Sequence, residues 1–402
     1  MLRNLHRIIL SKGNCVRKNV RQCSSATKTS LFDFHVQKGG KMVNFGGFML
    51  PVQYADQSIS NSHVFTRENA SLFDVSHMLQ TEIQGKASCE FMETLVTASV
   101  KNLPIGSATL TIFTDENGGI LDDLIITKVA DDHLFVVSNA GRKEHDMGHM
   151  KQGQLAFEKK TREKINIRFY DPAERALLAL QGPKAAAALQ KLTDVNLKSL
   201  YFMESVVGPV AGIKGCRISR CGYTGEDGFE ISIPAIKSAY IAEEMLRNEE
   251  VKLAGLGARD SLRLEAGLCL YGSDISTKTT PVEAALTWLV DKQRREAADF
   301  PGAKQILHQI KEKSEIKRVG LVSKEGPPAR HDAIIVSSYG KDIGTVTSGC
   351  PAPSLGKNIA MGYVPTEISK AGTQVQLKIR GKLYAAEVAK MPFVPAHYYR
   401  KK

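Results

Sequence analysis

The sequence predicts an α+β protein of several domains that ends in a small β-barrel or jelly-roll domain. Three observations lead to this fold class. β-rich segments occur in pairs joined by short polar turns, helical segments do not alternate strictly with single strands, and beyond residue 312 the chain holds short β-rich segments separated by Gly and Pro. Hairpins mixed with helices favour α+β over parallel βαβ architecture. Short strands at close intervals are typical of a barrel or jelly roll.

The elements of the first 311 residues follow from the periodicity of apolar residues. We expect helices at 57–74 and 87–96, in the polar stretch that follows Gly141, in the Ala-rich segment that ends at Leu192, and at 235–247 and 257–266. We expect strands at 81–83, 109–113, 120–129, 133–138, 176–180, 216–220 and 229–233. Residues 115–119 and 222–228 are rich in Asp, Asn and Gly, so each predicts a hairpin connection.

The composition changes near residue 312, where the charged run 311–315 indicates a linker. After it we expect six strands at 319–322, 333–336, 343–347, 360–364, 375–379 and 384–388. These segments form the predicted C-terminal domain, residues 312–402, while residues 29–311 form the larger α+β region.

Residues 1–28 have the features of a mitochondrial import signal. They contain seven Lys or Arg and no Asp or Glu, and Leu2, Leu5, Ile8 and Ile9 recur at nearly helical spacing. The alternative is a basic arm that binds nucleic acid; the apolar run is too short for a secretory signal. We expect cleavage between residues 23 and 28 and a location in the mitochondrial matrix.

Charge and composition exclude several classes of protein. The whole chain has a formal net charge of +12, and removal of the seven presequence charges leaves 12 − 7 = +5. This mild charge predicts no nucleic-acid partner but favours an acidic partner or an anionic substrate. No apolar stretch approaches the roughly 18 residues that a membrane span needs, so we expect no membrane association. The cysteines show no C-x-x-C spacing, which disfavours a metal site or a disulfide framework.

The segment 118–126 carries two adjacent carboxylates, Asp122 and Asp123, in a run of Ile and Leu. On a strand, the two side chains point to opposite faces, and both faces are apolar. At least one carboxylate should therefore lie in a dry environment that shifts its pKa and suits it to act as a general base. The alternative is an Asp at a strand end that caps a neighbouring loop.

Two further groups of residues are candidates for binding. Glu230 lies on the strand that returns from the 222–228 turn. It could accept two N–H bonds from an amino-pyrimidine edge, or it could be a surface residue. Glu226 and Asp227, within the turn, should be solvated. Arg259 and Arg263 share a helix face and suit carboxylate recognition, although Arg263 could instead pair with Asp260 or Glu265.

Histidines give weaker signals. His145 and His149 could bind a metal at i, i+4, but the acidic residues around them favour an exposed polar helix. His77, in the run Phe73–Met78, is expected to be a packing residue.

Seven motifs in this order resemble the aminomethyltransferase (T protein) family of the glycine cleavage system, over about residues 31–399. They are Phe73–Met78, Gly118–Ile126, Val137–Gly141, Leu180–Pro183, Arg220–Glu230, Ala258–Tyr271 and Lys390–Val394. The resemblance implies a three-domain fold around a central hole, with two intertwined α+β domains in residues 29–311 and the barrel after them.

The resemblance also implies a reaction. Members of the family transfer the aminomethyl carbon from the lipoyl arm of the H protein to tetrahydrofolate, a co-substrate, and release ammonia, 5,10-methylenetetrahydrofolate and dihydrolipoyl H protein. The implied partners are tetrahydrofolate, the lipoylated H protein and, more loosely, the other glycine cleavage components; no metal is implied. The implied catalytic residue is Asp123, and the implied folate-binding residues are Met78, Leu110, Asn139, Glu230, Arg259 and Tyr398.

Two relatives of this family provide alternatives. A folate-binding branch that assists iron–sulfur assembly carries a signature Cys in a Lys-Gly-Cys-Tyr-type motif, whereas this chain has Cys221-Gly222-Tyr223 and an intact Asp-Asp pair. Sarcosine and dimethylglycine dehydrogenases share the fold but need a flavin domain, whose fingerprint is missing from this sequence. Both comparisons favour the transferase.

Overall fold

The computed structural model describes residues 26–401. The predicted presequence therefore lies outside the described residues except for its last three positions. Among these, Thr27 and Lys28 form the short strand β1 (Thr27–Lys28), which pairs in parallel with Phe48 and Met49. None of the helices within residues 26–401 is long and apolar enough to cross a bilayer.

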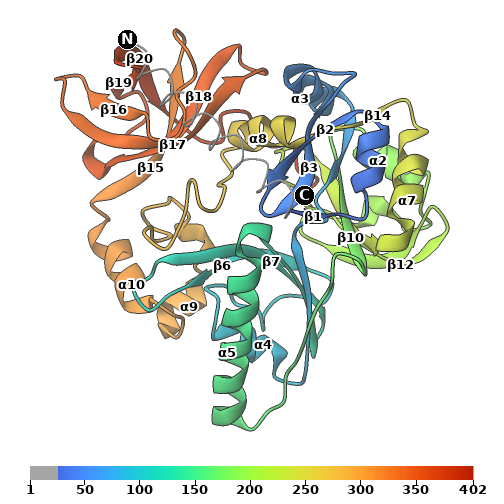
Figure 1. Ribbon diagram of the computed structural model, residues 1–402. Helices are drawn as coiled ribbons and strands as arrows, with labels where there is room; N and C mark the ends of the chain where they lie inside the picture. Colours follow the sequence, from blue (N-terminus) through green and yellow to red (C-terminus); the bar gives the residue numbers. More distant parts are fainter. Residues whose placement is uncertain (1–25, 402) are drawn as a thin grey trace, which may run out of the picture.

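Three lobes make up the molecule and surround a central region (Figure 1). The first contains a six-stranded sheet in the order β11-β12-β13-β10-β4-β14. Its strands are β4 (Ala70–Asp74), β10 (Arg175–Gln181), β11 (Ser205–Val210), β12 (Ile213–Ser219), β13 (Gly228–Pro234) and β14 (Val251–Leu253). A three-stranded sheet, β1-β3-β2, with β2 (Gly40–Phe45) and β3 (Phe48–Tyr54), belongs to the same lobe.

Both faces of the six-stranded sheet are covered. Because side chains alternate along each strand, the sheet contributes residues to two separate cores. One face packs on the helices α2 (Phe32–Gln37), α6 (Ala185–Gln190) and α7 (Ser238–Leu246) through residues such as Leu178 and Ile241. The other face packs on α8 (Leu256–Glu265) through Leu177 and Leu262. Helix α8 therefore lies between this sheet and the rest of the molecule.

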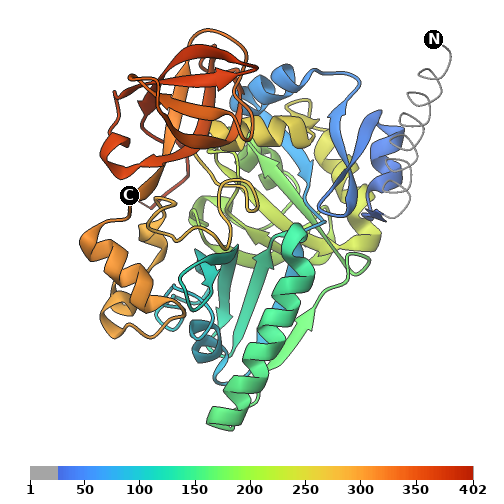
Figure 2. The same ribbon diagram turned by 60° about the vertical axis from the view of Figure 1, so that its left-hand side comes forward.

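The second lobe is a five-stranded sheet in the order β6-β7-β8-β5-β9. Its strands are β5 (Leu79–Gln84), β6 (Ala108–Thr114), β7 (Ile120–Ala130), β8 (His133–Ser138) and β9 (Asn166–Phe169). The helices α4 (Ser88–Glu93) and α5 (Lys143–Thr161) cover its outer face, where Phe91 and Phe157 pack on Leu124 and Ile126. The 60° rotation shows α5 lying along the sheet (Figure 2).

The third lobe is a closed barrel in the order β15-β18-β17-β16-β19-β20, which confirms the barrel prediction. Its strands are β15 (Ile316–Ser323), β16 (Ile334–Ser337), β17 (Asp342–Ala352), β18 (Lys357–Pro365), β19 (Gln374–Ile379) and β20 (Lys382–Ala389). Five of the six strands contain one of the segments predicted from the sequence, and the sixth, β16, overlaps the predicted segment 333–336 except at Ala333. A core that includes Leu321, Ile335 and Leu377 fills the barrel.

Two predictions about local structure were wrong. The predicted helix 57–74 is α3 (Ile59–Glu68) followed by the strand β4, which lies between β10 and β14 and is buried on both faces. A strand buried on both faces has no alternating pattern, so periodicity could not identify it. The charged run 311–315 was predicted to be a linker, but its first two residues belong to the helix α10 (Ala303–Glu312). Helix α10 follows α9 (Lys292–Ala297).

Candidate active site

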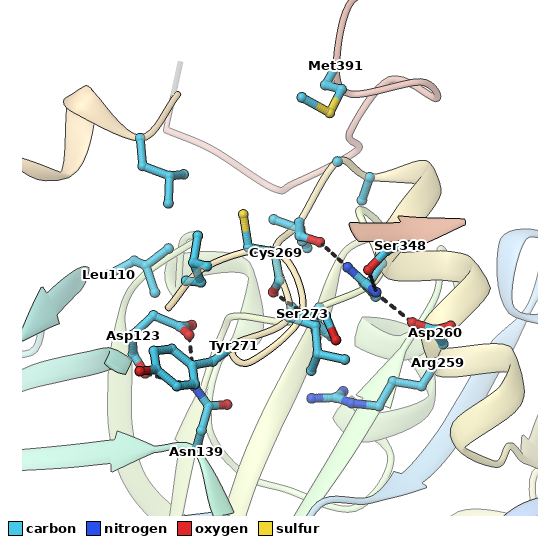
Figure 3. Close-up of a pocket in the computed structure, with 18 of the residues that line it drawn as sticks. Leu110, Asp123, Asn139, Arg259, Asp260, Cys269, Tyr271, Ser273, Ser348 and Met391 are labelled. Atoms are coloured by element: carbon cyan, nitrogen blue, oxygen red, sulfur yellow. Dashed lines mark hydrogen bonds and ion pairs between the residues drawn. The ribbon is translucent and has the colours of Figure 1, made fainter. Parts of the chain in front are cut away.

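A cavity of about 1740 Å³ lies where the three lobes meet. It is larger than the roughly 300–1,000 Å³ of a common ligand pocket. All seven residues that the sequence implied as catalytic or folate-binding line it: Met78, Leu110, Asp123, Asn139, Glu230, Arg259 and Tyr398. Figure 3 shows the wall formed by β6, β7 and α8. The fold thus brings together residues that are up to 320 positions apart (398 − 78 = 320).

Strand β7 places its two carboxylates on opposite sides, as predicted. Asp122 shares its side with Leu124 and Ile126, and its side chain is fully buried. Asp123 and Ile125 face the cavity instead. The strand is fixed between β6, where Ile112 lies opposite Asp123, and β8, where Ser138 lies opposite Leu124.

Asn139, directly after β8, holds both carboxylates. Its side-chain Nδ2 donates to Asp123 Oδ1 at 2.8 Å and to Asp122 Oδ1 at 3.0 Å, and its backbone N–H donates to Asp122 Oδ2 at 3.1 Å. Burial raises the pKa of Asp123 to about 7. A carboxyl group with this pKa can take up or release a proton near neutral pH, which is the property of a general acid–base group.

Glu230 and Arg259 form a second polar group on the cavity wall. Glu230, on β13, is buried, so the surface interpretation was wrong. Burial raises its pKa, while the nearby charge of Arg259 opposes that shift. Arg259 extends from α8 toward the cavity (Figure 3) with its guanidinium group 4.7 Å from the ring centre of Tyr223. Its Nη1 atom is buried and has no hydrogen-bond partner within the described residues.

Arg263, one helical turn further, has a different environment. Its guanidinium group bonds to Asp260 at 2.8 Å, to Asp274 at 2.5 Å and to Ser348 of the barrel at 2.9 Å. The structural alternative for Arg263 is therefore confirmed, with Asp260 as a predicted partner and Asp274 as an additional one. Glu265, the other residue considered, pairs with His63 and Arg67.

The prediction that Glu226 and Asp227 are solvated was wrong. Glu226 is buried and pairs with Arg67 at 2.9 Å and with His397 at 3.0 Å. Asp227 pairs with Arg220 at 2.5 Å. Glu226 thus holds the turn against segments that are far away in the sequence, whereas Asp227 pairs with Arg220 just before the same turn.

The remaining predicted residues supply apolar and aromatic surface. Met78 packs against the core that contains Phe73, and Leu110 packs near Ile112. Tyr398, in the C-terminal segment, stacks on Phe202 with the ring centres 4.1 Å apart.

The sequence did not single out several other residues of the cavity wall. Tyr271 lies in an irregular loop and donates from its hydroxyl to Ile120 O at 3.1 Å, and the Arg142 guanidinium lies 5.1 Å from its ring centre. Tyr223 supports Arg259. Loop residues have no periodicity, so only their membership of a longer motif could have pointed to them.

His77 has the packing role that was favoured for it. His77 is buried against Phe45, with the ring centres 5.6 Å apart, and burial lowers its pKa to about 4. The rings of His145 and His149, which both lie on α5, stack on each other. Within residues 26–401, no group of three His, Cys, Asp or Glu is arranged to hold a metal ion.

The chain matches two family models. The model of the GCVT N-terminal domain covers residues 31–294, and that of the glycine cleavage T-protein C-terminal barrel domain covers residues 317–395.

Curated relatives and a solved structure agree with these models. The mitochondrial aminomethyltransferase of Homo sapiens is 53% identical over 375 residues, which are 93% of this chain and 92% of that protein. That of Flaveria trinervia is 49% identical over 391 residues, 97% and 95% of the two chains. The crystal structure of the glycine cleavage system aminomethyltransferase T from Bartonella henselae superposes with a TM-score of 0.87 at 38% identity, covering 94% of this chain and all of that one. The chain belongs to the aminomethyltransferase (T-protein) family of the glycine cleavage system.

Proposed function

We propose that the chain transfers an aminomethyl carbon from the lipoyl arm of the H protein to tetrahydrofolate. The products are 5,10-methylenetetrahydrofolate, ammonia and dihydrolipoyl H protein. The observation that carries this proposal is the single cavity that collects all seven implied residues, with Asp123 held by Asn139 on its wall.

The cavity suits an anionic ligand with a flat heterocycle. Its lining contains eight Lys or Arg side chains (Arg142, Arg259, Arg263, Lys317, Arg318, Arg330, Lys390 and Arg400) but three carboxylates (Asp123, Glu230 and Asp260). A positive excess favours the carboxylates of folate. Buried polar atoms without a partner are unfavourable, so the free Nη1 of Arg259 is available to a ligand.

We assign roles to the implied residues on this basis. Met78, Leu110 and Asn139 line the pterin site, Glu230 accepts N–H bonds from the heterocycle, and Arg259 and Tyr398 make two further contacts with the folate. The volume of the cavity leaves room for the lipoyl arm beside the folate.

The chemistry requires a carboxylate in a dry position. The carbon to be transferred lies between nitrogen and sulfur, so breaking its bond to sulfur sends the electron pair to a thiolate and leaves an iminium-like centre. Asp123 stabilises this positive charge, and burial strengthens the interaction because little water screens it. Tetrahydrofolate, when bound, supplies the two nitrogens that take up the carbon. Each of these nitrogens loses one proton: Asp123 accepts one and passes it toward the departing amine, and the other protonates the thiolate to give the dihydrolipoyl group.

The proposal extends to place and partners. The relatives compared above are named mitochondrial, and we propose the matrix as the location and the lipoylated H protein as the partner, with looser association with the other glycine cleavage components. We place the end of the presequence before Thr27, because Thr27 and Lys28 pair with β3. We place the boundary between the two main parts of the mature chain, predicted between residues 311 and 312, directly after Glu312, where α10 ends.

The direct test mixes the purified chain with aminomethylated H protein and tetrahydrofolate. Ammonia and 5,10-methylenetetrahydrofolate should form in equal amounts and only when all three components are present. The matched control omits tetrahydrofolate. Failure to form either product with a folded chain would contradict the proposal.

A further inference from the structure

A second buried carboxyl group lies behind Asp123, on the side away from the cavity. Asp146 is in the first turn of α5, its side chain is fully buried, and it contacts Asp122. Asp122 is also fully buried, and neither residue lines the cavity. Asp123 and Asn139 therefore line the cavity, with Asp122 and Asp146 behind them.

The contacts of this cluster require a proton between its two inner members. Both oxygens of Asp122 already accept hydrogen bonds from Asn139, at 3.0 and 3.1 Å. Oδ2 of Asp146 is buried and receives no hydrogen bond from an N–H group within residues 26–401. Two ionised carboxylates in contact repel each other, whereas one protonated carboxyl can donate to the other.

We propose that Asp122 and Asp146 share one proton and act as a positioning pair for Asp123. The pair holds Asn139 so that its amide donates to Asp123, and it keeps the carboxyl group nearest to Asp123 uncharged. The effect on rate rests on the function proposed above, whereas the shared proton does not.

The position of each residue indicates which one holds the proton. Asp146 lies at the N-terminal end of a helix, where the helix dipole favours a negative charge, and the charge of Arg142 also lowers its pKa. Burial nevertheless raises the pKa of both carboxyl groups, and the charge of Asp146 raises the pKa of Asp122 further, against the hydrogen bonds that Asp122 accepts from Asn139. At neutral pH the proton therefore resides on Asp122 and the charge on Asp146.

Other titratable groups face the cluster from each element packed against it. They are Arg142, His145 and His149 near the start of α5, Tyr223 in the turn before β13, and Cys269 and Tyr271 in the loop after α8. Burial lowers the pKa of both histidines and raises that of the thiol and both phenols. The two histidines, the thiol and the two phenols therefore keep one charge state between pH 7 and 8.

The first test is the pH dependence of kcat/KM for the transfer, whose acid limb reports the ionisation of Asp123. Asp146→Asn removes the negative charge that keeps the proton on Asp122. Asp122 should then ionise beside Asp123, and the acid limb of the profile should move up by roughly one pH unit. Asp122→Asn keeps a neutral group that donates to Asp146, so the limb should stay in place even if kcat falls. Glu144→Gln, which removes an exposed charge from the same helical turn, is the matched control and should leave the profile unchanged.

Two outcomes would overturn the proposal. A downward shift of the limb in Asp122→Asn would show that Asp122 is ionised in the native protein, and equal profiles for Asp146→Asn and Glu144→Gln would show that Asp146 does not act on Asp123. Activity of the unaltered chain establishes the transfer independently, so a failure of the pair is distinct from a failure of the proposed function.

A second test does not depend on activity. The infrared spectrum at pH 8 should contain the C=O band of a protonated carboxyl group that disappears in Asp122→Asn. No difference between the two spectra would overturn the proposal even if Asp146→Asn failed to fold.

Discussion

Two regions of the molecule bury polar and charged side chains, and they differ in how those side chains are paired. In the first region, α8 meets α3 and the barrel: Glu265 accepts hydrogen bonds from Arg67, His63 and Ser354, at 3.0, 2.9 and 2.7 Å. In the second region, the cavity wall, the buried Nη1 of Arg259 and Nδ1 of His77 have no partner within the described residues.

The difference separates residues that hold the fold together from those available to a ligand. Breaking a fully paired buried network leaves an uncompensated charge, which is strongly destabilising. Removing a donor that has no internal partner breaks no hydrogen bond. Glu230, the buried carboxyl group beside Arg259, can then become neutral by taking up a proton, because burial already raises its pKa. We therefore expect variants of the first region to lose stability and variants of the second to lose binding or turnover.

The largest effect should come from Asp123→Asn. We expect turnover to fall by about 10²–10⁴-fold, the usual contribution of one general acid–base group. Binding of tetrahydrofolate should remain within a few fold, because the amide preserves the shape of the wall. Transfer kinetics and a separate titration with tetrahydrofolate measure the two quantities. Turnover equal to that of the unaltered chain would remove Asp123 from the mechanism.

The next effect concerns the paired region. Arg263→Ala leaves the buried carboxylate of Asp274 without its cation, so the free energy of unfolding should fall by about 3–5 kcal/mol. Denaturant unfolding measures this loss, and Arg259→Ala provides the control on the same helix. Similar losses in the two variants would break the distinction between the regions.

The two regions should also respond oppositely to pH. Burial acts to raise the pKa of Glu265, but the bonds from His63 and Ser354 together outweigh it and hold the pKa at about 2. A lowered pKa contributes stability above pH 4.5 that is lost as the pH falls toward 2, here about 2–3 kcal/mol.

Asp123 has a raised pKa, so its ionisation lowers stability as the pH rises from about 4 to 7. Thermal unfolding across pH 3–8 measures both trends: Glu265→Gln should flatten the acid side, and Asp123→Asn should gain stability relative to the unaltered chain as the pH rises. Trends of the same sign would contradict this part of the comparison.

The smallest effect should come from Arg259→Gln. Loss of a charged hydrogen bond to the ligand, worth about 1.5–3 kcal/mol, should weaken tetrahydrofolate binding by roughly 10- to 100-fold. The midpoint of thermal unfolding should stay within a degree or two. Calorimetric titration measures the binding, and Lys317→Gln on the cavity rim is the control for a simple loss of charge. An equal loss of tetrahydrofolate binding in the two variants would show that Arg259 contributes only its positive charge.

The sequence by itself determined the features that depend on local periodicity. Alternation along a strand placed Asp122 and Asp123 on opposite faces, and short strands separated by Gly and Pro gave the barrel, because both patterns arise from neighbouring residues. The basic presequence is also a local pattern, and it stays a prediction.

The tertiary structure decided the pairing of charges. Arg67 and Glu226 are 159 residues apart, Arg263 and Ser348 are 85 apart, and nothing within either segment indicates its partner. The strand Ala70–Asp74 was missed for the same reason, since its identity depends on β10 and β14 on either side. Whether a buried charge is paired or open to a ligand depends on which distant segments the fold brings beside it, and this is why the cavity wall and the paired network became distinct only in three dimensions.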